Sequence, residues 1–336
     1  MNRYDYVRPD TIADAIVALN SPDARALAGG TNLVDLMKYD VARPGRVVDI
    51  NRLPLKSIVA EDGVLRVGAL VSNSDLAWHA DVRERWPLLS SAILAGASPQ
   101  LRNAATTGGN LLQRTRCYYF YDPSTACNKR NPGSGCSAIG GVNRIHAIFG
   151  ASDACIAVHP SDMCVALAAL DATVEVEGLA GSRSIPIDGF HRLPDSEPER
   201  DNTLKPGELI TGVSIPEPDF GTYYSYLKIR DRLSYAFALV SVAAALRIED
   251  GVIADARIAL GGVAHKPWRD FDAEKSLLGK PAETSSFSQV AQMILRYAKG
   301  QGGNDFKIDL ARRAIVRALE QAAVGAPQDQ AVKSIQ

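Results

Sequence analysis

The segment from Gln113 to Ser152 lacks the hydrophobic periodicity that runs through the rest of this 336-residue chain. It contains the aromatic run Tyr118–Tyr121, two prolines, many glycines and three of the five cysteines, Cys117, Cys127 and Cys136. Burial of apolar side chains alone is a weak means of ordering a stretch of this length and composition. We therefore expect another kind of interaction to hold this segment in place.

The residues that precede this segment predict a small lobe at 1–55, in which helices alternate with strands. Apolar residues at helical spacing predict a helix at 12–19, with Asp10 or Thr11 as its N-cap. Apolar runs at 25–28 and 47–50 predict two strands that enclose a second helix. Such a strand–helix–strand unit favours parallel pairing with a right-handed crossover.

A larger lobe of mixed helix and sheet is predicted for residues 56–217, and a separate C-terminal domain for residues 218–330. The larger lobe combines helical and strand-like patterns, at 64–70, 86–97, 163–170, 173–177 and 209–215. The C-terminal domain should contain a three-stranded antiparallel sheet followed by two helices, at 224–229, 236–248, 252–260, 287–298 and 308–323.

The charge balance and the apolar runs argue against nucleic-acid binding, membrane insertion and a secretory leader. Thirty-seven Lys and Arg residues face 38 Asp and Glu residues, and the net charge of −1 gives no global positive field to attract nucleic acid. No uncharged apolar run reaches the ~18 residues of a membrane-spanning helix. Charged residues near the start, from Arg3 to Asp10, interrupt any secretory leader.

Two glycine turns are candidate phosphate sites. Ala28–Leu33 lies where a strand gives way to a helix, so its backbone N–H groups could bind an anion, and Thr106–Asn110 has a similar composition. Together the two turns could hold a pyrophosphate, although each alone also fits an ordinary turn. Gly133–Ala138 matches the dinucleotide fingerprint G-x-G-x-x-A, but it follows Asn131–Pro132 instead of a strand, so we do not interpret it as a Rossmann site.

The cysteine spacing by itself does not decide between a metal site, disulfides and unrelated thiols. None of the five cysteines forms a C-x-x-C pair. Four thiolates suit either zinc or a [4Fe-4S] cluster. Six basic residues against one acidic residue between Gln100 and His146 would offset the negative charge of such a cluster. Cys164 lies in an apolar helical run and is most simply a packed side chain.

No catalytic constellation is visible in the sequence. The five histidines fall in no metal-binding pattern, His159 is most simply structural, and neither G-x-S-x-G nor S-x-x-K occurs. A phosphate site without proton-transfer residues suggests a cofactor that carries the chemistry itself. We therefore predict no catalytic side chain on this chain.

Six short motifs, in this order along nearly the whole chain, carry a family resemblance. They are Tyr4–Pro9, Ala28–Leu33, Thr107–Asn110, Pro160–Asp162, Gly261–Ala264 and Lys266–Arg269. Together they resemble the FAD-binding subunit of the xanthine dehydrogenase family of molybdenum hydroxylases. The resemblance implies an α+β architecture. Its FAD-binding domain at 1–217 has the PCMH-type fold, and a CO-dehydrogenase-flavoprotein-like domain follows at 218–330.

The resemblance also implies the cofactor site. The two glycine turns would wrap the FAD pyrophosphate, Asp162 would bond a sugar or ribityl hydroxyl, and Lys228 would approach the isoalloxazine. The FAD-binding residues implied in this way are Ala28, Gly29, Gly30, Thr31, Asn32, Leu33, Thr107, Gly108, Gly109, Asn110, Asp162 and Lys228.

The aperiodic segment is an insertion relative to ordinary members of the family. Residues 113–155 are similar to the corresponding insertion in the flavin subunits of bacterial periplasmic aldehyde oxidoreductases. The similarity includes the short sequences Arg114–Cys117, Cys127–Arg130 and Pro132–Cys136. That similarity implies a [4Fe-4S] cluster and makes disulfides improbable. Its ligands would be Cys117, Cys127, Cys136 and Cys155.

The family implies a heterotrimer. Its partners would be a large molybdopterin subunit that oxidises the substrate and a small subunit with two [2Fe-2S] clusters. This chain would receive electrons on FAD and pass them to an external acceptor, and we favour a structural role for the [4Fe-4S] cluster. The competing interpretations are a self-sufficient flavin oxidase and a zinc-stabilised module without redox function. We expect export to the periplasm with a signal-bearing partner, and the alternative is a cytoplasmic complex.

Overall fold

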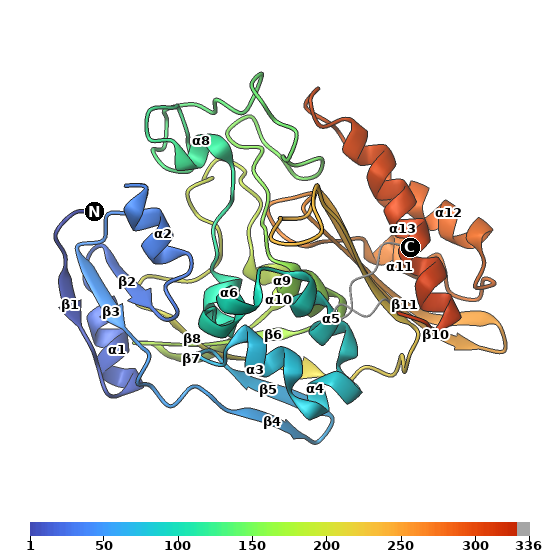
Figure 1. The fold of residues 1–336 in the computed structure, drawn as a ribbon, viewed down its shortest axis with the longest axis horizontal. Helices are drawn as coiled ribbons and strands as arrows, with labels where there is room; N and C mark the ends of the chain where they lie inside the picture. The colour runs from blue at the N-terminus through green and yellow to red at the C-terminus, as the bar shows by residue number, and fades with distance from the viewer. Residues whose placement is uncertain (328–336) are drawn as a thin grey trace.

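The structure is a computed structural model, and it describes residues 1–327. Three sheets form its framework, and the chain passes through them in sequence order (Figure 1). A three-stranded sheet belongs to the N-terminal lobe, a five-stranded sheet to the second lobe and a four-stranded sheet to the C-terminal part. The mixed α+β architecture agrees with the fold class expected from the sequence. The expected end of the C-terminal domain at residue 330 lies outside the described residues.

The N-terminal lobe contains the predicted strand–helix–strand unit. Strands β1 (Asp5–Val7), β3 (Arg46–Asp49) and β2 (Ala24–Leu27) pair in that order, and both pairings are parallel. Helix α1 (Ile12–Leu19) begins after Thr11, whose side chain accepts a hydrogen bond from the backbone N–H of Asp14. Helix α2 (Leu33–Lys38) follows the first glycine turn. The predicted parallel pairing is confirmed, whereas the three-residue β1 is too short to give a periodic signal.

The second lobe is built on a five-stranded antiparallel sheet, and the central strand of this sheet is the last of the five in the sequence. The order is β4–β5–β8–β6–β7, comprising Ile58–Glu61, Val64–Gly68, Leu209–Pro216, Thr173–Gly178 and Gly181–Pro186. Helices α5 (Pro87–Ala95) and α9 (Asp162–Ala169) contact each other, and most of their residues are buried. The short helices of this lobe are α3 (Asn73–Trp78), α4 (Ala80–Arg85), α6 (Pro99–Ala104), α7 (Thr107–Leu111), α8 (Tyr118–Tyr121) and α10 (Ile187–Phe190).

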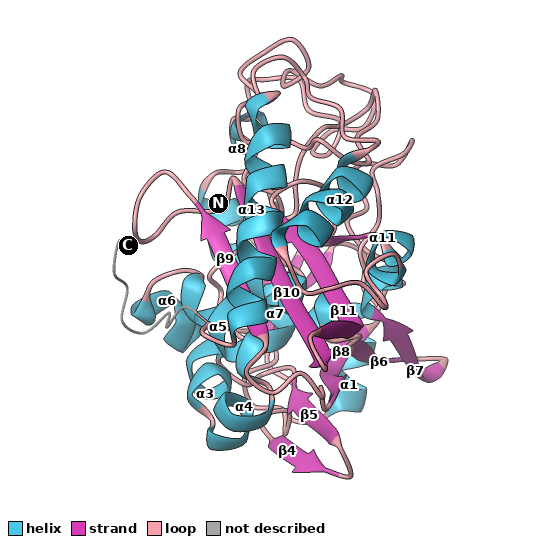
Figure 2. Ribbon diagram, turned by 90° about the vertical axis from the view of Figure 1, so that its right-hand side faces the viewer, coloured by secondary structure: helices cyan, strands magenta, loops and turns pink. Residues whose placement is uncertain are grey.

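The C-terminal part contains an antiparallel sheet in the order β12–β11–β10–β9, comprising Trp268–Arg269, Val252–Gly261, Val240–Glu249 and Tyr224–Ile229. Helices α12 (Thr284–Leu295) and α13 (Phe306–Val324) lie on one face of this sheet (Figure 2), and α11 (Phe271–Lys275) contacts β11. The strand predicted from residue 236 begins instead at Val240. β9 ends at Ile229, which pairs with Val240, so residues 236–239 have no strand beside them and, with the turn at Tyr235 (φ 52°), belong to a loop.

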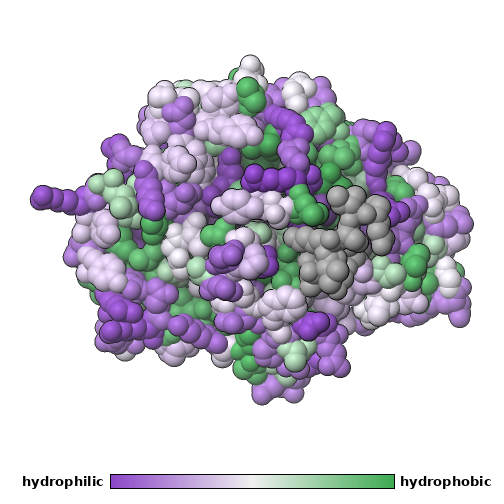
Figure 3. Space-filling model, viewed as in Figure 1, coloured by the Kyte–Doolittle hydropathy of each residue, from purple (hydrophilic) through white to green (hydrophobic). Residues whose placement is uncertain are grey.

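The insertion lies apart from the three sheets, as looped chain around α8 (Figure 1). Its buried apolar cluster is small and contains three of the cysteines, which share it with Leu36, Phe120, Ala138, Ile156 and Ala157. On the face shown in Figure 3, hydrophilic residues predominate and hydrophobic ones form small separate groups. Among residues 1–327, no helix combines the length and the apolarity needed to cross a bilayer.

Candidate functional site

A cavity of about 660 Å³ is lined by residues of both N-terminal lobes and of the C-terminal part. Half of the twelve FAD-binding residues implied by the resemblance line it: Thr31, Asn32, Gly109, Asn110, Asp162 and Lys228. The other six lie in the same turns without lining the cavity: Ala28, Gly29, Gly30, Leu33, Thr107 and Gly108. The structure therefore brings together residues from four distant parts of the chain, as expected.

The first glycine turn offers unpaired backbone donors. Within residues 1–327, the N–H groups of Thr31, Asn32 and Leu33 have no hydrogen-bond acceptor. Gly30 has a φ of 72°, a left-handed conformation that turns the chain from β2 into α2. Successive free N–H groups at the start of a helix attract an anion. The turn therefore fits the pyrophosphate of a dinucleotide cofactor.

Gly29 allows two backbone segments to approach each other closely. A Cβ at this position would collide with the carbonyl oxygen of Ala104, at the end of α6. The position of the first turn relative to α6 depends on that contact.

The second glycine turn differs from the expectation. The N–H groups of Thr107 and Gly108 donate to the carbonyl oxygens of Val71 and Ala69, both at 2.9 Å. Those of Gly109 and Asn110 donate to the hydroxyl and the carbonyl oxygen of Thr106. These amides are therefore engaged in holding the turn against the segment after β5. The turn presents Gly109 and the Asn110 side chain to the cavity, and it does not form a second amide cradle.

Asp162 and Lys228 form a buried ion pair at the cavity wall. The Nζ of Lys228 lies 2.7 Å from Oδ2 of Asp162, and the two side chains are 3% and 8% exposed. The hydroxyl of Tyr226 donates to Oδ1 of Asp162 at 2.7 Å. Burial, together with the Asp162 charge, raises the pKa of Tyr226 well above its usual value, so this hydroxyl keeps its proton. The Asp162 carboxylate is thus fixed in orientation by two donors.

We expect Lys228→Met to destabilise the protein by about 3 kcal/mol, because it leaves the Asp162 carboxylate buried without a counter-charge. Urea unfolding of the purified subunit measures this effect. The matched control is Lys280→Met, since the side chain of Lys280 makes an exposed hydrogen bond to Gln289. Equal stability losses for the two variants would show that the Asp162–Lys228 pair contributes no more to the free energy of unfolding than an exposed hydrogen bond does.

We expect Gly30→Val to lose bound flavin, because a Cβ there lies 3.1 Å from Cγ2 of Val34 in a backbone conformation that valine disfavours. Iron content should not change, since no residue of this turn lines the cysteine cavity. Gly63→Val is the control: Gly63 has a φ of 71° and open space around it, so it shares the backbone strain without the collision. Retention of flavin in Gly30→Val would contradict the role assigned to the turn.

The four cysteines expected to bind a metal line one small cavity in the insertion. Cys117 precedes α8, Cys127 and Cys136 face each other in an isolated antiparallel bridge, and Cys155 lies in a turn bridged to Ser152. All four are free thiols, and three of them are buried, with Cys136 partly exposed. The structure therefore brings together four side chains that are separated by up to 38 residues in the sequence.

Burial opposes ionisation of these thiols. It raises the pKa of Cys117 to about 12 and that of Cys155 to about 11, and the charge of Lys129 opposes the shift at Cys155. Only the thiolate binds a metal, so a bound cation has to displace these protons. The Nε2 of His146 lies 3.1 Å from Sγ of Cys117, and burial lowers the pKa of His146 to about 4. That ring is consequently neutral near pH 7.

Two polar clusters attach the insertion to the rest of the protein. Asp201 accepts hydrogen bonds from Nζ of Lys129 at 2.5 Å and from Nε of Arg114 at 2.6 Å. On the other side, Asp35 of α2 accepts from both Arg116 and the hydroxyl of Tyr121. Neither contact was predictable from local patterns, because each joins residues more than 70 positions apart.

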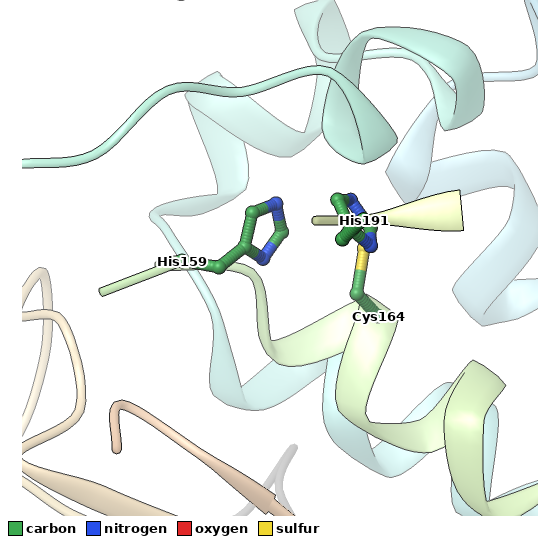
Figure 4. A group of neighbouring side chains, drawn as sticks. All are labelled: His159, Cys164 and His191. Atoms are coloured by element: carbon green, nitrogen blue, oxygen red, sulfur yellow. The ribbon is translucent and has the colours of Figure 1, made fainter. Parts of the chain in front are cut away.

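A further group of metal-ligand atoms lies in the main core. His159, Cys164 and His191 place one ligand atom each within 4.8 Å of the others (Figure 4). The ring centroids of the two histidines are 4.2 Å apart. Two imidazoles bound tetrahedrally to one ion, with metal–nitrogen bonds of about 2.0 Å, would have centroids roughly 5 Å apart. The two rings lie closer together than such a site requires, with their planes tilted by 49°, and we assign this group to packing.

Comparison with known proteins places this geometry in a family. The model described as the FAD binding domain in molybdopterin dehydrogenase matches residues 2–218. The chain belongs to this family of molybdenum hydroxylase subunits. The model of the CO dehydrogenase flavoprotein C-terminal domain matches residues 224–322.

Curated relatives of this FAD-binding subunit cover nearly its whole length. It is 49% identical to the aldehyde oxidoreductase FAD-binding subunit PaoB of Escherichia coli K12, over 96% of this chain and 99% of that protein. It is 27% identical to the carbon monoxide dehydrogenase medium chain of Hydrogenophaga pseudoflava, over 95% and 97%. A solved carbon monoxide dehydrogenase from the same organism matches with a TM-score of 0.76 and 26% identity, covering 96% and 98%.

Several residues that line the large cavity were not predicted. Arg116 and Tyr118 come from the insertion, whereas Arg232, Tyr235 and Phe237 come from the loop between β9 and β10. The loop residues lie next to a segment that we interpreted as a strand, so their role was hidden. Arg116 and Tyr118 flank Cys117, a predicted metal ligand, and this position was the sequence feature that could have pointed to them.

Proposed function

We propose that this chain is the FAD and [4Fe-4S] electron-transfer subunit of a heterotrimeric molybdenum-containing aldehyde oxidoreductase. The observation that carries the proposal is the convergence of four thiols on one cavity in an insertion that has almost no other core. The similarity to a subunit named for aldehyde oxidoreductase supports the substrate class. The partners would be a molybdopterin-binding large subunit and a small subunit with two [2Fe-2S] clusters.

FAD, when bound, supplies the ability to take up electrons singly and release them in pairs or singly. The chain's own residues bind and orient it. The free N–H groups of Thr31, Asn32 and Leu33 fit the pyrophosphate, and the fixed Asp162 carboxylate can accept a hydrogen bond from a cofactor hydroxyl. Lys228 is held by Asp162 and by the carbonyl oxygen of Ala95, so it contributes a fixed positive charge at the wall.

The four thiols alone suit either metal site. Four thiolates can hold one zinc ion, with bonds of about 2.3 Å, or a [4Fe-4S] cluster. The similarity of the insertion to the flavin subunits of aldehyde oxidoreductases supports the cluster, and the metal content of the purified subunit decides between the two.

The cluster's proposed role is to fasten the insertion. It would join Cys155, next to the main fold, to three cysteines of a segment with little apolar burial of its own. Rapid-mixing spectra after addition of an aldehyde to the purified complex test this role. We expect flavin bleaching at the turnover rate with little change in the cluster, and reduction and reoxidation of the cluster at that rate would contradict a purely structural role.

The visible spectrum of the purified subunit separates the competing functions. Flavin bands with a broad brown iron–sulfur shoulder support the proposal. Flavin bands alone would favour a self-sufficient flavin oxidase, and a colourless protein containing zinc would favour a module without redox function. Aldehyde-dependent reduction of an artificial acceptor by the co-expressed three-subunit complex then tests the activity directly.

A further inference from the structure

A single layer of chain separates the cysteine cavity from the flavin cavity. In the segment 115–119, Thr115, Cys117 and Tyr119 line the cysteine cavity, whereas Arg116 and Tyr118 line the flavin cavity. From Thr115 to Cys117 the alternation is that of an extended chain, and Tyr118 and Tyr119 continue it at the start of α8. The two sites therefore share a wall that is one residue thick.

A second segment continues the same wall. Ile145 lines the flavin cavity, and the next residue, His146, reaches Cys117 with its ring. A third pair repeats the pattern, because Ala157 lines the cysteine cavity and Val158 the flavin cavity. His146 is 1% exposed, so its ring lies inside this wall.

The backbone at His146 is gripped by the C-terminal part of the chain. Its carbonyl oxygen accepts hydrogen bonds from Nδ2 of Asn304 at 3.0 Å and from Nζ of Lys307 at 2.8 Å. Both donors are fully buried, and Lys307 also donates to the carbonyl oxygen of Gly262, another residue that lines the flavin cavity. The backbone N–H of His146 donates to the carbonyl oxygen of Asn143. The backbone that carries the ring is thus held from several directions.

The chemistry of Cys117 fixes the direction of the hydrogen bond. A sulfur that binds iron carries no proton, so it can only accept, and Nε2 of His146 must be the protonated ring nitrogen. Nδ1 has no hydrogen-bond partner among residues 1–327, which agrees with the tautomer in which it carries no hydrogen. The geometry therefore places one ring N–H of His146 against the sulfur.

We propose that His146 is a positioning residue for the [4Fe-4S] cluster, whose N–H bond to the Cys117 sulfur raises the reduction potential of the cluster. This inference rests on the proposed function. A hydrogen bond to a cluster sulfur stabilises the reduced state, which carries the greater negative charge, more than the oxidised state. Because the wall to the flavin cavity is one residue thick, the potential set here bears directly on whether electrons pass between the two sites.

The test compares His146→Phe and His146→Gln with the wild-type subunit in EPR-monitored redox titrations. Phenylalanine keeps a buried ring without a donor, whereas glutamine keeps an N–H group that can reach the sulfur. We expect the Phe variant to disfavour cluster reduction at least tenfold, which is a potential lower by about 59 mV for one electron. The Gln variant should recover part of that shift. Iron and flavin contents should stay at wild-type values in both.

The control is His265→Phe, because His265 is also buried and neither of its ring nitrogens has a partner among residues 1–327. Its cluster potential should match the wild type. An unchanged potential in His146→Phe, with iron retained, would overturn the inference and leave the proposed function intact. Absence of iron from the wild-type protein would instead overturn the proposed function. If His146→Phe loses iron, Lys307→Met provides a second test, because it removes one hydrogen bond to the His146 carbonyl oxygen and keeps the ring. This variant should lower the cluster potential by a smaller amount, and an unchanged potential would count against the inference.

Discussion

Cys136→Ser should lose the iron of the purified subunit while retaining its FAD. A serine hydroxyl stays protonated near neutral pH and is a poor ligand for iron, so a cluster with three remaining thiolates would be unstable. Cys136 is the most exposed of the four cysteines, and the substitution therefore removes little packing. Elemental analysis and the visible spectrum measure the loss directly.

Cys164→Ala is the matched control for this experiment. Cys164 is a buried free thiol like the others, but it belongs to α9 and packs in the main core. It should retain iron, even though removal of a buried sulfur costs stability. Wild-type iron content in Cys136→Ser would remove this residue from the ligand set. Limited proteolysis should cut Cys136→Ser within 113–155 much faster than the wild type, because the cluster no longer fastens the insertion.

Among single substitutions of the charged residues that attach the insertion to the rest of the protein, Asp201→Asn should be the most destabilising. It leaves the ammonium of Lys129, which is 1% exposed, buried without a counter-charge, and it weakens the bond to Arg114. Removing one partner of a buried pair typically costs about 3–5 kcal/mol. Because the Asp201 side chain is 21% exposed, we expect the lower end of that range. Thermal unfolding, with Asp231→Asn of an exposed pair as control, measures the difference.

The same pair predicts a dependence of stability on pH. Burial alone would raise the pKa of Asp201, but the charges of Arg114 and Lys129 outweigh it and hold that pKa well below its usual range. A carboxyl whose pKa is lower in the folded state stabilises the protein above its unfolded pKa of about 4, and this contribution is lost as the pH falls below that value. Wild-type stability should therefore decline below about pH 4, and the decline should be smaller in Asp201→Asn. An equal decline in both proteins would contradict the assignment.

The elements with strong local signals were predictable from the sequence. Helix α1, with Thr11 as its cap, and the parallel strands β2 and β3 follow from spacing and turn chemistry alone. The free amides of the first glycine turn were also predictable, because a strand, a Gly-Gly pair and a helix occur in succession. The grouping of the four cysteines came from resemblance, since their spacing left zinc, iron and disulfides open.

What the sequence could not predict depends on contacts between distant segments. The backbone amides of Thr107 and Gly108 donate hydrogen bonds to the segment after β5, which lies beside them in the fold. No local sequence pattern predicts that contact. Gly29 is required by the carbonyl oxygen of Ala104, 75 positions away. The role of Asp201 likewise arises only when the connection after α10 meets the insertion. In each case the fold, and not the local composition, decides which groups remain free for a ligand.

The most direct test is the FAD, iron, acid-labile sulfide and zinc content of the wild-type subunit purified without oxygen. We expect one FAD, four iron and four sulfide per chain, with no zinc, and an EPR signal of a reduced [4Fe-4S] cluster after dithionite. A protein without flavin whose cysteines are joined in disulfides or hold zinc would contradict the account.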